Sequence, residues 1–276
     1  MRPAARKLFA MKAPEPELPA EDGPAVSGVE EHLAALLRPQ SFETDQYRAL
    51  GQFVAQARTS TDAKLVAVTS PVAGDGKTTT AINLAAALAQ SPGTRVLLVD
   101  TDLRRPLVAS NLGLDSEGPG LAGAAVDPRL DTRALVRPCF DFSILPAGTP
   151  PDNPFQVLES PRIGELLAEA RRDYDYVVLD TPPVLLVPDC KLMSRWVDGF
   201  LLVVAAHRTP RKLLGEALTA MGEAKVLGIV FNGDDRPFAG FYGKYYGRYY
   251  RERGGEDRGG WWRGKGNRQA RPLPWR

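Results

Sequence analysis

The segment from Ser70 to Thr80 reads SPVAGDGKTTT and carries residue types that together bind a chain of phosphates. Glycines at 74 and 76 let the backbone turn its amide N–H groups toward an anion. Lys77 supplies a positive charge for the outer phosphates, and Thr78 supplies a hydroxyl ligand for Mg²⁺. We therefore expect a phosphate-binding loop (P-loop) whose nucleotide contacts come from Gly74, Asp75, Gly76, Lys77, Thr78 and Thr79.

The sequence on either side of this loop fits the same interpretation. The apolar run Leu65 to Val68 predicts a strand before it, and Ala81 to Ala89 predicts a helix after it. Pro71 stands where the standard spacing has glycine, so the loop is of the deviant Walker A type. A glycine-containing turn with an exposed lysine is the alternative, and the flanking strand and helix disfavour it.

Three aspartates follow two further apolar strands. Val96 to Val99 leads into Asp100 and Asp102, and Tyr176 to Leu179 leads into Asp180. A single aspartate at such a position is often only a helix cap or turn residue. Ligands bind where parallel strands end, however, and residues i and i+2 of a strand share a face. Together with the P-loop, the three acids predict a phosphate and metal site.

Short apolar strands alternate with helical segments along the chain and would position these residues. We expect strands at 65–69, 96–100, 142–145, 176–180, 199–205 and 226–231. Helices are expected at 29–37, 44–58, 77–90, 105–112, 161–172, 189–196 and 209–222. Strands such as VLLVD and YVVLD are apolar throughout, which is typical of parallel sheets covered on both faces. The predicted fold class is α/β: a doubly wound, mostly parallel sheet flanked by helices.

Composition divides the chain into three parts. We expect a disordered arm at 1–28, a folded domain at 29–235 and a flexible tail at 236–276. The whole chain carries a net charge of +2, but the tail holds 11 basic and three acidic residues. No apolar run is long enough for a membrane span, and the N-terminus does not resemble a signal peptide. Cys139 and Cys190 indicate neither a zinc site nor a disulfide framework, and His207 is expected to be a surface residue.

The order and spacing of these motifs resemble the bacterial protein-tyrosine kinases of capsule and exopolysaccharide assembly, in their stand-alone form. That family's P-loop reads S-x-x-x-G-D/E-G-K-S/T, which Ser70 to Thr78 matches. Its second strand ends in D-x-D-x-R, matched here by Asp100, Asp102 and Arg104. Three apolar residues followed by D-x-x-P match residues 177–183, and the likeness extends over about residues 40–250.

The resemblance implies ATP and Mg²⁺ as cofactors and gives each site residue a role. Lys77 would contact the phosphates, and Asn232 would contact adenine. The metal ligands would be Thr78, Asp102 and Asp180, and the catalytic set would be Lys77, Asp100 and Asp102. Asp100 is the expected base for the tyrosine hydroxyl proton, although Asp102 stays open for the same task.

The tail carries a cluster of five tyrosines, which are Tyr242, Tyr245, Tyr246, Tyr249 and Tyr250. The resemblance implies that they are phosphoacceptors, modified when the tail of one molecule enters the site of another. The glycines among them favour this reading because they leave the segment free to thread. The alternative is an aromatic and basic segment that binds RNA or membrane, although no nucleic-acid partner is expected.

Partners are also implied by the resemblance. They are a membrane-embedded polysaccharide co-polymerase that activates the kinase, further copies of this chain, and a cognate phosphatase. We expect a cytoplasmic protein held at the inner face of the membrane through that co-polymerase. One departure concerns the family's ring-forming motif E-x-x-R-x-x-R, because Asp45 replaces the glutamate and Gly51 the second arginine. The ring is therefore less expected than the kinase chemistry.

Two other functions stay open. One is an ATPase switch of the MinD/ParA kind, which positions proteins on membranes or DNA. Those proteins carry an additional lysine at the position of Val72 and lack the tyrosine cluster. The other is a regulator that binds ATP without transferring phosphate.

Overall fold

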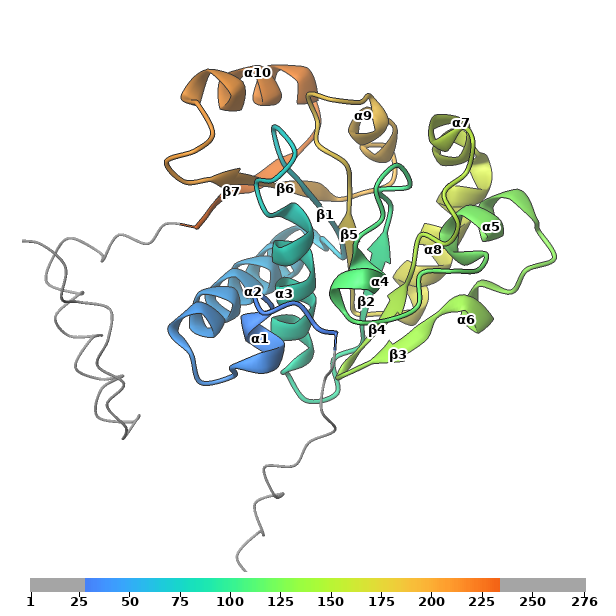
Figure 1. Cartoon of the computed structure of the whole chain (residues 1–276), viewed down its shortest axis with the longest axis horizontal. Helices are drawn as coiled ribbons and strands as arrows, with labels where there is room; N and C mark the ends of the chain where they lie inside the picture. Colours follow the sequence, from blue (N-terminus) through green and yellow to red (C-terminus); the bar gives the residue numbers. More distant parts are fainter. Residues whose placement is uncertain (1–27, 234–276) are drawn as a thin grey trace, which may run out of the picture. The chain divides into compact units, whose positions relative to one another are not determined.

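The computed structural model describes residues 28–233, which form an α/β domain around a seven-stranded sheet (Figure 1). Its strand order is β3-β4-β2-β5-β1-β6-β7, and all neighbours are parallel except the pair β3 and β4. The strands are β1 (Leu65–Thr69), β2 (Val96–Asp100), β3 (Arg137–Cys139), β4 (Phe142–Leu145), β5 (Tyr176–Asp180), β6 (Gly199–Ala205) and β7 (Val226–Asn232). The helices are α1 (Ala34–Leu37), α2 (Phe42–Thr61), α3 (Lys77–Ala89), α4 (Val108–Asn111), α5 (Gly120–Val126), α6 (Thr132–Leu135), α7 (Pro154–Glu159), α8 (Pro161–Asp173), α9 (Asp189–Met193) and α10 (Arg211–Met221).

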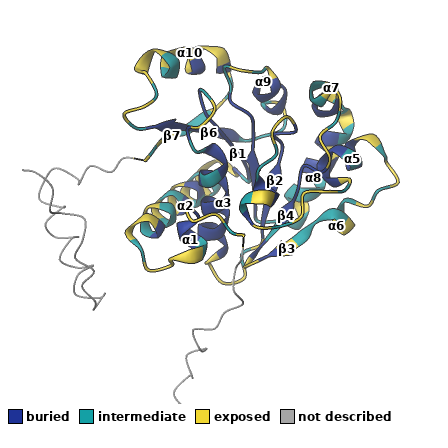
Figure 2. Ribbon diagram, in the orientation of Figure 1, coloured by how far each residue is buried: buried dark blue, intermediate teal, exposed yellow. Residues whose placement is uncertain are grey.

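Helices cover the sheet on both faces, which confirms the predicted fold class. Successive residues of β1 enter different cores: Leu65 and Ala67 face α5, α7, α8, α9 and α10, whereas Val66 and Val68 face α1, α2, α3 and α4. Figure 2 shows β1, β2 and β5 buried along their length. Each strand therefore needs apolar side chains on both sides, and this is why the strands do not alternate in polarity.

The predicted elements differ from the observed ones mainly where segments are short. The helix expected at 29–37 is restricted to Ala34–Leu37, because Val29 instead pairs with Leu112 in an isolated bridge. The helix expected at 105–112 begins only at Val108. Three short helices, α5, α6 and α7, were not predicted. Nor was β3, whose three residues Arg-Pro-Cys carry too little apolar pattern to indicate a strand.

The sheet brings the predicted chemistry to one edge. In the register of β2 and β5, Asp100 lies opposite Asp180, and in that of β1 and β5, Val68 lies opposite Asp180. The ends of these three adjacent strands therefore meet where α3 begins, which is where doubly wound sheets bind ligands. No helix within residues 28–233 is long and apolar enough to span a membrane. The arm and tail predicted at 1–28 and 236–276 lie almost wholly outside the described residues, so those boundaries stay predictions.

Candidate active site

The P-loop joins β1 to α3 through two glycines in a left-handed conformation. Gly74 and Gly76 have φ values of 87° and 90°, which side chains other than glycine rarely adopt. A Cβ atom placed on Gly76 would lie 1.9 Å from Nδ2 of Asn232, so this position also excludes a side chain for lack of space. Gly76 is the N-cap of α3, and no side chain caps the helix. Its first N–H groups are therefore suited to a phosphate oxygen.

The side chain of Lys77 lies between two of the predicted acids. Its Nζ atom is 2.8 Å from Oδ2 of Asp102 and 3.5 Å from Oδ1 of Asp180. The hydroxyl of Thr78 donates to Oδ2 of Asp180 at 2.6 Å. All four side chains are buried. Residues from the ends of β2 and β5 and from the start of α3 thus form one connected polar cluster.

Asp100 is close to this cluster but is bonded differently. Its Oδ2 accepts hydrogen bonds from the N–H groups of Leu107 and Val108, both at 3.1 Å. Its Oδ1 accepts from the N–H of Asp102 at 3.2 Å. Both oxygens therefore hold the loop that follows β2, whereas Asp102 is the carboxylate that faces Lys77.

Burial shifts the pKa of two aspartates at this site, Asp180 and Asp100. It raises the pKa of Asp180 to about 6, although Lys77 and Thr78 partly oppose the rise. Burial, followed by the charge of Asp180, raises the pKa of Asp100 well above its ordinary value. For Lys77, burial lowers the pKa, but the carboxylates of Asp180 and Asp102 together outweigh it and the pKa is raised. Together with Asp100, the cluster holds three carboxyl groups and one ammonium, which is an excess of negative charge when all are ionised.

The donor set fits Mg²⁺. The hydroxyl of Thr78 and the carboxylates of Asp102 and Asp180 are hard oxygen ligands, and a divalent cation would neutralise the excess charge. Nowhere in residues 28–233 do three or more His, Cys, Asp or Glu side chains form a ready-made metal cage. This agrees with the usual behaviour of Mg²⁺ at nucleotide sites, where it takes one or two carboxylates and the remaining ligands from phosphates and water.

Two contacts at the site involve residues that the sequence did not single out. The hydroxyl of Thr209, in the loop after β6, donates to Oδ1 of Asp75 at 2.5 Å. The guanidinium of Arg208 lies over the P-loop, with Nη2 3.7 Å from a Cβ position placed on Gly74. The adjacency of β6 and β1 creates both contacts, and no local pattern in the sequence reveals it. Asn232 also reaches the P-loop, because its Nδ2 donates to the carbonyl of Asp75 at 3.0 Å.

Arg104, the last residue of the D-x-D-x-R motif, contacts α9. Its Nε and Nη2 donate to the two carboxylate oxygens of Asp189 at 3.0 and 3.2 Å. Asp189 is fully buried, so this ion pair is anchored at its acidic end. The arginine therefore links the loop after β2 to the segment after β5.

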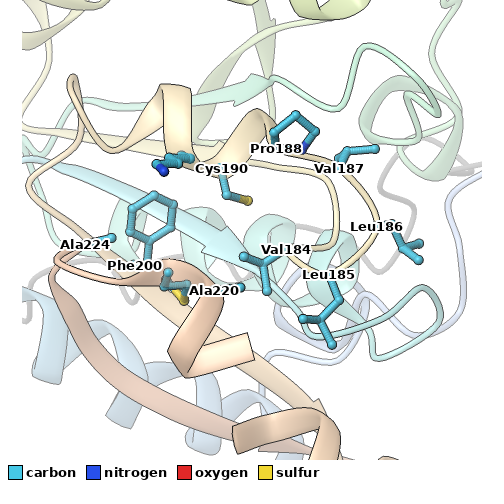
Figure 3. A pocket seen from close by; sticks show the side chains of 11 residues that line it. Val184, Leu185, Leu186, Val187, Pro188, Cys190, Phe200, Ala220 and Ala224 are labelled. Carbon is cyan, nitrogen blue, oxygen red and sulfur yellow. The ribbon is translucent and has the colours of Figure 1, made fainter. Parts of the chain in front are cut away.

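An apolar pocket of about 350 Å³ adjoins the site without being part of it (Figure 3). It lies between the 184–188 segment, α9 and the end of α10. The N–H of Val184 donates to the carbonyl of Ser70 at 2.8 Å, which links this wall of the pocket to the start of the P-loop. None of the predicted phosphate-binding residues lines it, so it is not the nucleotide site.

Two sequence features remain, which are the tail tyrosines and the segment of α2 that departs from the ring-forming motif. The tyrosines at 242–250 lie outside the described residues, so their role stays a prediction. In α2, Asp45 forms an ion pair with Arg48 at 2.7 Å. Gly51 is buried, and a Cβ atom there would lie 3.7 Å from the side chain of Leu88 in α3. Position 51 thus packs inside this domain.

Comparison with known proteins gives consistent matches. Residues 66–237 match the family described as the CobQ/CobB/MinD/ParA nucleotide binding domain. The tyrosine-protein kinase YwqD of Bacillus subtilis is 34% identical over 224 residues, which are 80% of this chain and 93% of that protein. The succinoglycan biosynthesis transport protein ExoP of Rhizobium meliloti is 31% identical over 78% of this chain, but the match spans only 29% of ExoP. Among solved structures, the kinase domain of the Escherichia coli tyrosine kinase ETK has a TM-score of 0.69 and 27% identity, covering 73% of this chain and 79% of that one.

Proposed function

Because the chain belongs to the bacterial protein-tyrosine kinases, we propose that its own site transfers the γ-phosphoryl group of ATP to tyrosine hydroxyls with Mg²⁺. The observation that carries this proposal is the cluster of Lys77, Thr78, Asp102 and Asp180 at the mouth of a glycine-turned P-loop. A cation, a hydroxyl and two carboxylates at the start of an uncapped helix are the groups that phosphoryl transfer requires.

The reaction follows from the chemistry of these groups. The tyrosine oxygen attacks the γ-phosphorus, the bond to the β–γ bridging oxygen breaks, and ADP leaves. Lys77 and the first N–H groups of α3 neutralise charge on the phosphates. Thr78, Asp102 and Asp180 would hold Mg²⁺, which when bound draws negative charge away from the phosphate oxygens. A carboxylate takes up the hydroxyl proton.

Asp100 and Asp102 are the candidates for that carboxylate. The raised pKa of Asp100 favours it, since a base is more effective when its pKa approaches the working pH. Its three backbone hydrogen bonds disfavour it, because they already occupy both oxygens. Asp102 accepts a hydrogen bond from the N–H of Arg105 at Oδ1, and its Oδ2, which faces Lys77, would be released when that lysine turns to a phosphate. We propose Asn232 as the adenine contact, supported by its position against Asp75 and Gly76.

The biological role that we propose is control of exopolysaccharide or capsule polymerisation and export, supported by the likeness to ExoP. The proposed partners are a membrane-embedded co-polymerase that activates the kinase, other copies of this chain as substrates, and a phosphatase. Through the co-polymerase the chain would act in the cytoplasm, at the inner face of the membrane.

A phosphotyrosine assay on the purified full chain tests the proposal. With ATP and Mg²⁺ we expect phosphotyrosine to accumulate on the protein, and none with EDTA. A MinD/ParA-like switch would instead release inorganic phosphate without phosphotyrosine, and a non-catalytic regulator would bind ATP and do neither. Either of these two results, obtained with a co-polymerase segment also supplied, would contradict the kinase assignment.

A further inference from the structure

The loop after β6 reaches the P-loop and carries a cation that the motifs do not include. Arg208 places Nη2 3.7 Å from the Cβ position of Gly74, the glycine that begins the phosphate-binding turn. Gly74 has a φ of 87° and no side chain, so no Cβ atom lies between this turn and the guanidinium. Lys77 is the only cation of the P-loop itself, and it is directed at Asp102 and Asp180.

This loop is bonded firmly to the P-loop. Thr209, the residue after the arginine, donates to the buried carboxylate of Asp75 at 2.5 Å. On the other side, the N–H of Ala206 donates to the carbonyl of Asn232 at 2.7 Å, and the Asn232 side chain donates to the Asp75 carbonyl. The P-loop and the end of β7 thus hold the loop on both sides of Arg208. The position of its Cα atom relative to the P-loop is therefore well defined, although its side chain is exposed.

The charge of Arg208 is not neutralised by any carboxylate of the described domain. Within residues 28–233, no Asp or Glu forms an ion pair with its guanidinium. Asp100, Asp102 and Asp180 lie around Lys77, at the ends of β2 and β5, and the carboxylate of Asp75 in the P-loop accepts a hydrogen bond from Thr209. A guanidinium offers five N–H donors in a planar fork that matches two oxygens of a phosphate. An unpaired fork above a phosphate-binding turn is therefore suited to bind the anion that occupies the turn.

We propose that Arg208 is a second phosphate-binding cation of this site, and that Thr209 positions it by anchoring its loop to Asp75. This inference rests on the proposed function, because it concerns the phosphates of the same nucleotide. It adds a binding residue that comes from the loop after β6 and that neither the P-loop nor the aspartate motifs contain.

Titration calorimetry of the full chain with Mg-ATP and Mg-ADP tests the inference. We expect Arg208→Ala to weaken both affinities about 5- to 20-fold, since hydrogen bonds between charged groups are stronger than neutral ones. Arg208→Lys keeps the charge but loses the planar fork of donors, so its nucleotide affinities should lie between those of the unchanged chain and those of Arg208→Ala. Arg211→Ala is the matched control, because it removes an exposed arginine three residues away, at the start of α10. The nucleotide affinities of Arg211→Ala should stay within twofold of those of the unchanged chain.

The outcomes separate this inference from the proposed function. If the unchanged chain binds nucleotide and Arg208→Ala binds as well as Arg211→Ala, the role of Arg208 is wrong and the kinase proposal stands. If the unchanged chain binds no nucleotide, the proposed function fails, and this inference fails with it. Equal unfolding temperatures for the two variants would show that the loss in Arg208→Ala is not caused by unfolding.

A double-mutant cycle tests the role of Thr209. Thr209→Val removes the hydrogen bond to Asp75 and should weaken Mg-ATP binding in the unchanged background. If Thr209 acts by positioning Arg208, the same substitution should weaken Mg-ATP binding much less in the Arg208→Ala background. Equal losses in the two backgrounds would contradict the positioning role.

Discussion

At the scale of single residues, the site depends on how one ammonium is shared among buried carboxylates. Lys77 contacts Asp102 at 2.8 Å and Asp180 at 3.5 Å, so without nucleotide its charge is already neutralised. In the proposed function, Lys77 would turn from at least one of these acids to contact a phosphate. The vacated carboxylates are then available for a metal ion or a proton, which couples nucleotide binding to the state of the acids.

Substitution of Asp100 and Asp102 should have different effects. Asp100→Asn places an amide where backbone N–H groups now meet carboxylate oxygens, so we expect a loss of about 1–3 kcal/mol in stability. Asp102→Asn keeps an oxygen that can accept the hydrogen bond from the N–H of Arg105, and if Asp102 is the base we expect it to slow phosphotyrosine formation about 100- to 10,000-fold. Thermal unfolding and initial labelling rates measure the two effects. An unchanged unfolding temperature for Asp100→Asn would show that its hydrogen bonds do not hold the loop.

The raised pKa of Asp180 predicts how stability depends on pH. Its folded-state pKa of about 6 lies above the ordinary value of 3.8, so the folded protein binds this proton more readily than the unfolded chain. Between these two values the contribution of Asp180 to stability falls as pH rises, and it is regained as pH is lowered through about 6. Unfolding measured in EDTA at pH 5 and pH 7.5 should show this difference, and Asp180→Asn should reduce it. The same pH response in both proteins would rule out Asp180 as its source.

At the scale of elements, the P-loop is shaped by a close approach between its turn and the end of β7. Gly76 leaves room for the side chain of Asn232, which itself donates to the Asp75 carbonyl. The conformation of the loop therefore depends on a strand that lies more than 150 residues later in the sequence. The end of β7 therefore supports the phosphate-binding turn through a long-range contact.

Gly76→Ala should lower the free energy of unfolding far more than an alanine at another left-handed glycine. Gly93 has a φ of 77° and nothing within 4 Å of its Cβ position, so Gly93→Ala pays only the backbone strain of about 1–2 kcal/mol. Gly76→Ala introduces the same backbone strain, and its Cβ atom also clashes with Asn232. It should therefore abolish nucleotide binding. Denaturant unfolding and calorimetry compare the two. Adding Asn232→Ala should recover part of the lost stability, and no recovery would mean that the collision is not the cause.

The sequence predicted those elements whose local pattern is strong. The strands β1, β2 and β5 are apolar runs ending in polar residues, and each was confirmed within a residue. The short β3 and the helices α5, α6 and α7 carry too few residues for a period to show. Arg208 and Thr209 could not be predicted either, because their place beside the P-loop follows from β6 pairing with β1. The different bonding partners of Asp100 and Asp102 could not be predicted from the spacing of these residues.

At the scale of the whole molecule, the described domain and the tail beyond it have separate tasks in the proposed function. The domain supplies a site at one edge of the sheet, and the tail is predicted to supply the acceptors. The ion pair between Arg104 and Asp189 and the hydrogen bond from Val184 to Ser70 link both sides of this site to the segment around α9. The second of these links joins the wall of the apolar pocket to the start of the P-loop (Figure 3).

Replacing the five tail tyrosines by phenylalanine separates the acceptor from the site. We expect phosphotyrosine on the protein to fall to background, because the hydroxyls that receive the phosphoryl group are gone. Nucleotide affinity should be unchanged, because the P-loop and its acids are intact. Mass spectrometry of the labelled chains, with Tyr174→Phe in the described domain as control, locates the acceptor. Label that persists after the fivefold change would place the acceptor elsewhere in the chain.

The most direct test of the central claim uses γ-labelled ATP and Mg²⁺ with the unchanged chain, Lys77→Met, and the control Lys212→Met, whose lysine is exposed on α10. We predict phosphotyrosine on the unchanged chain and on Lys212→Met, and none on Lys77→Met incubated alone. Mixed with the unchanged chain, Lys77→Met should become labelled, because its tyrosines are intact and the transfer occurs between molecules. Label on isolated Lys77→Met equal to that of the unchanged chain would contradict the account.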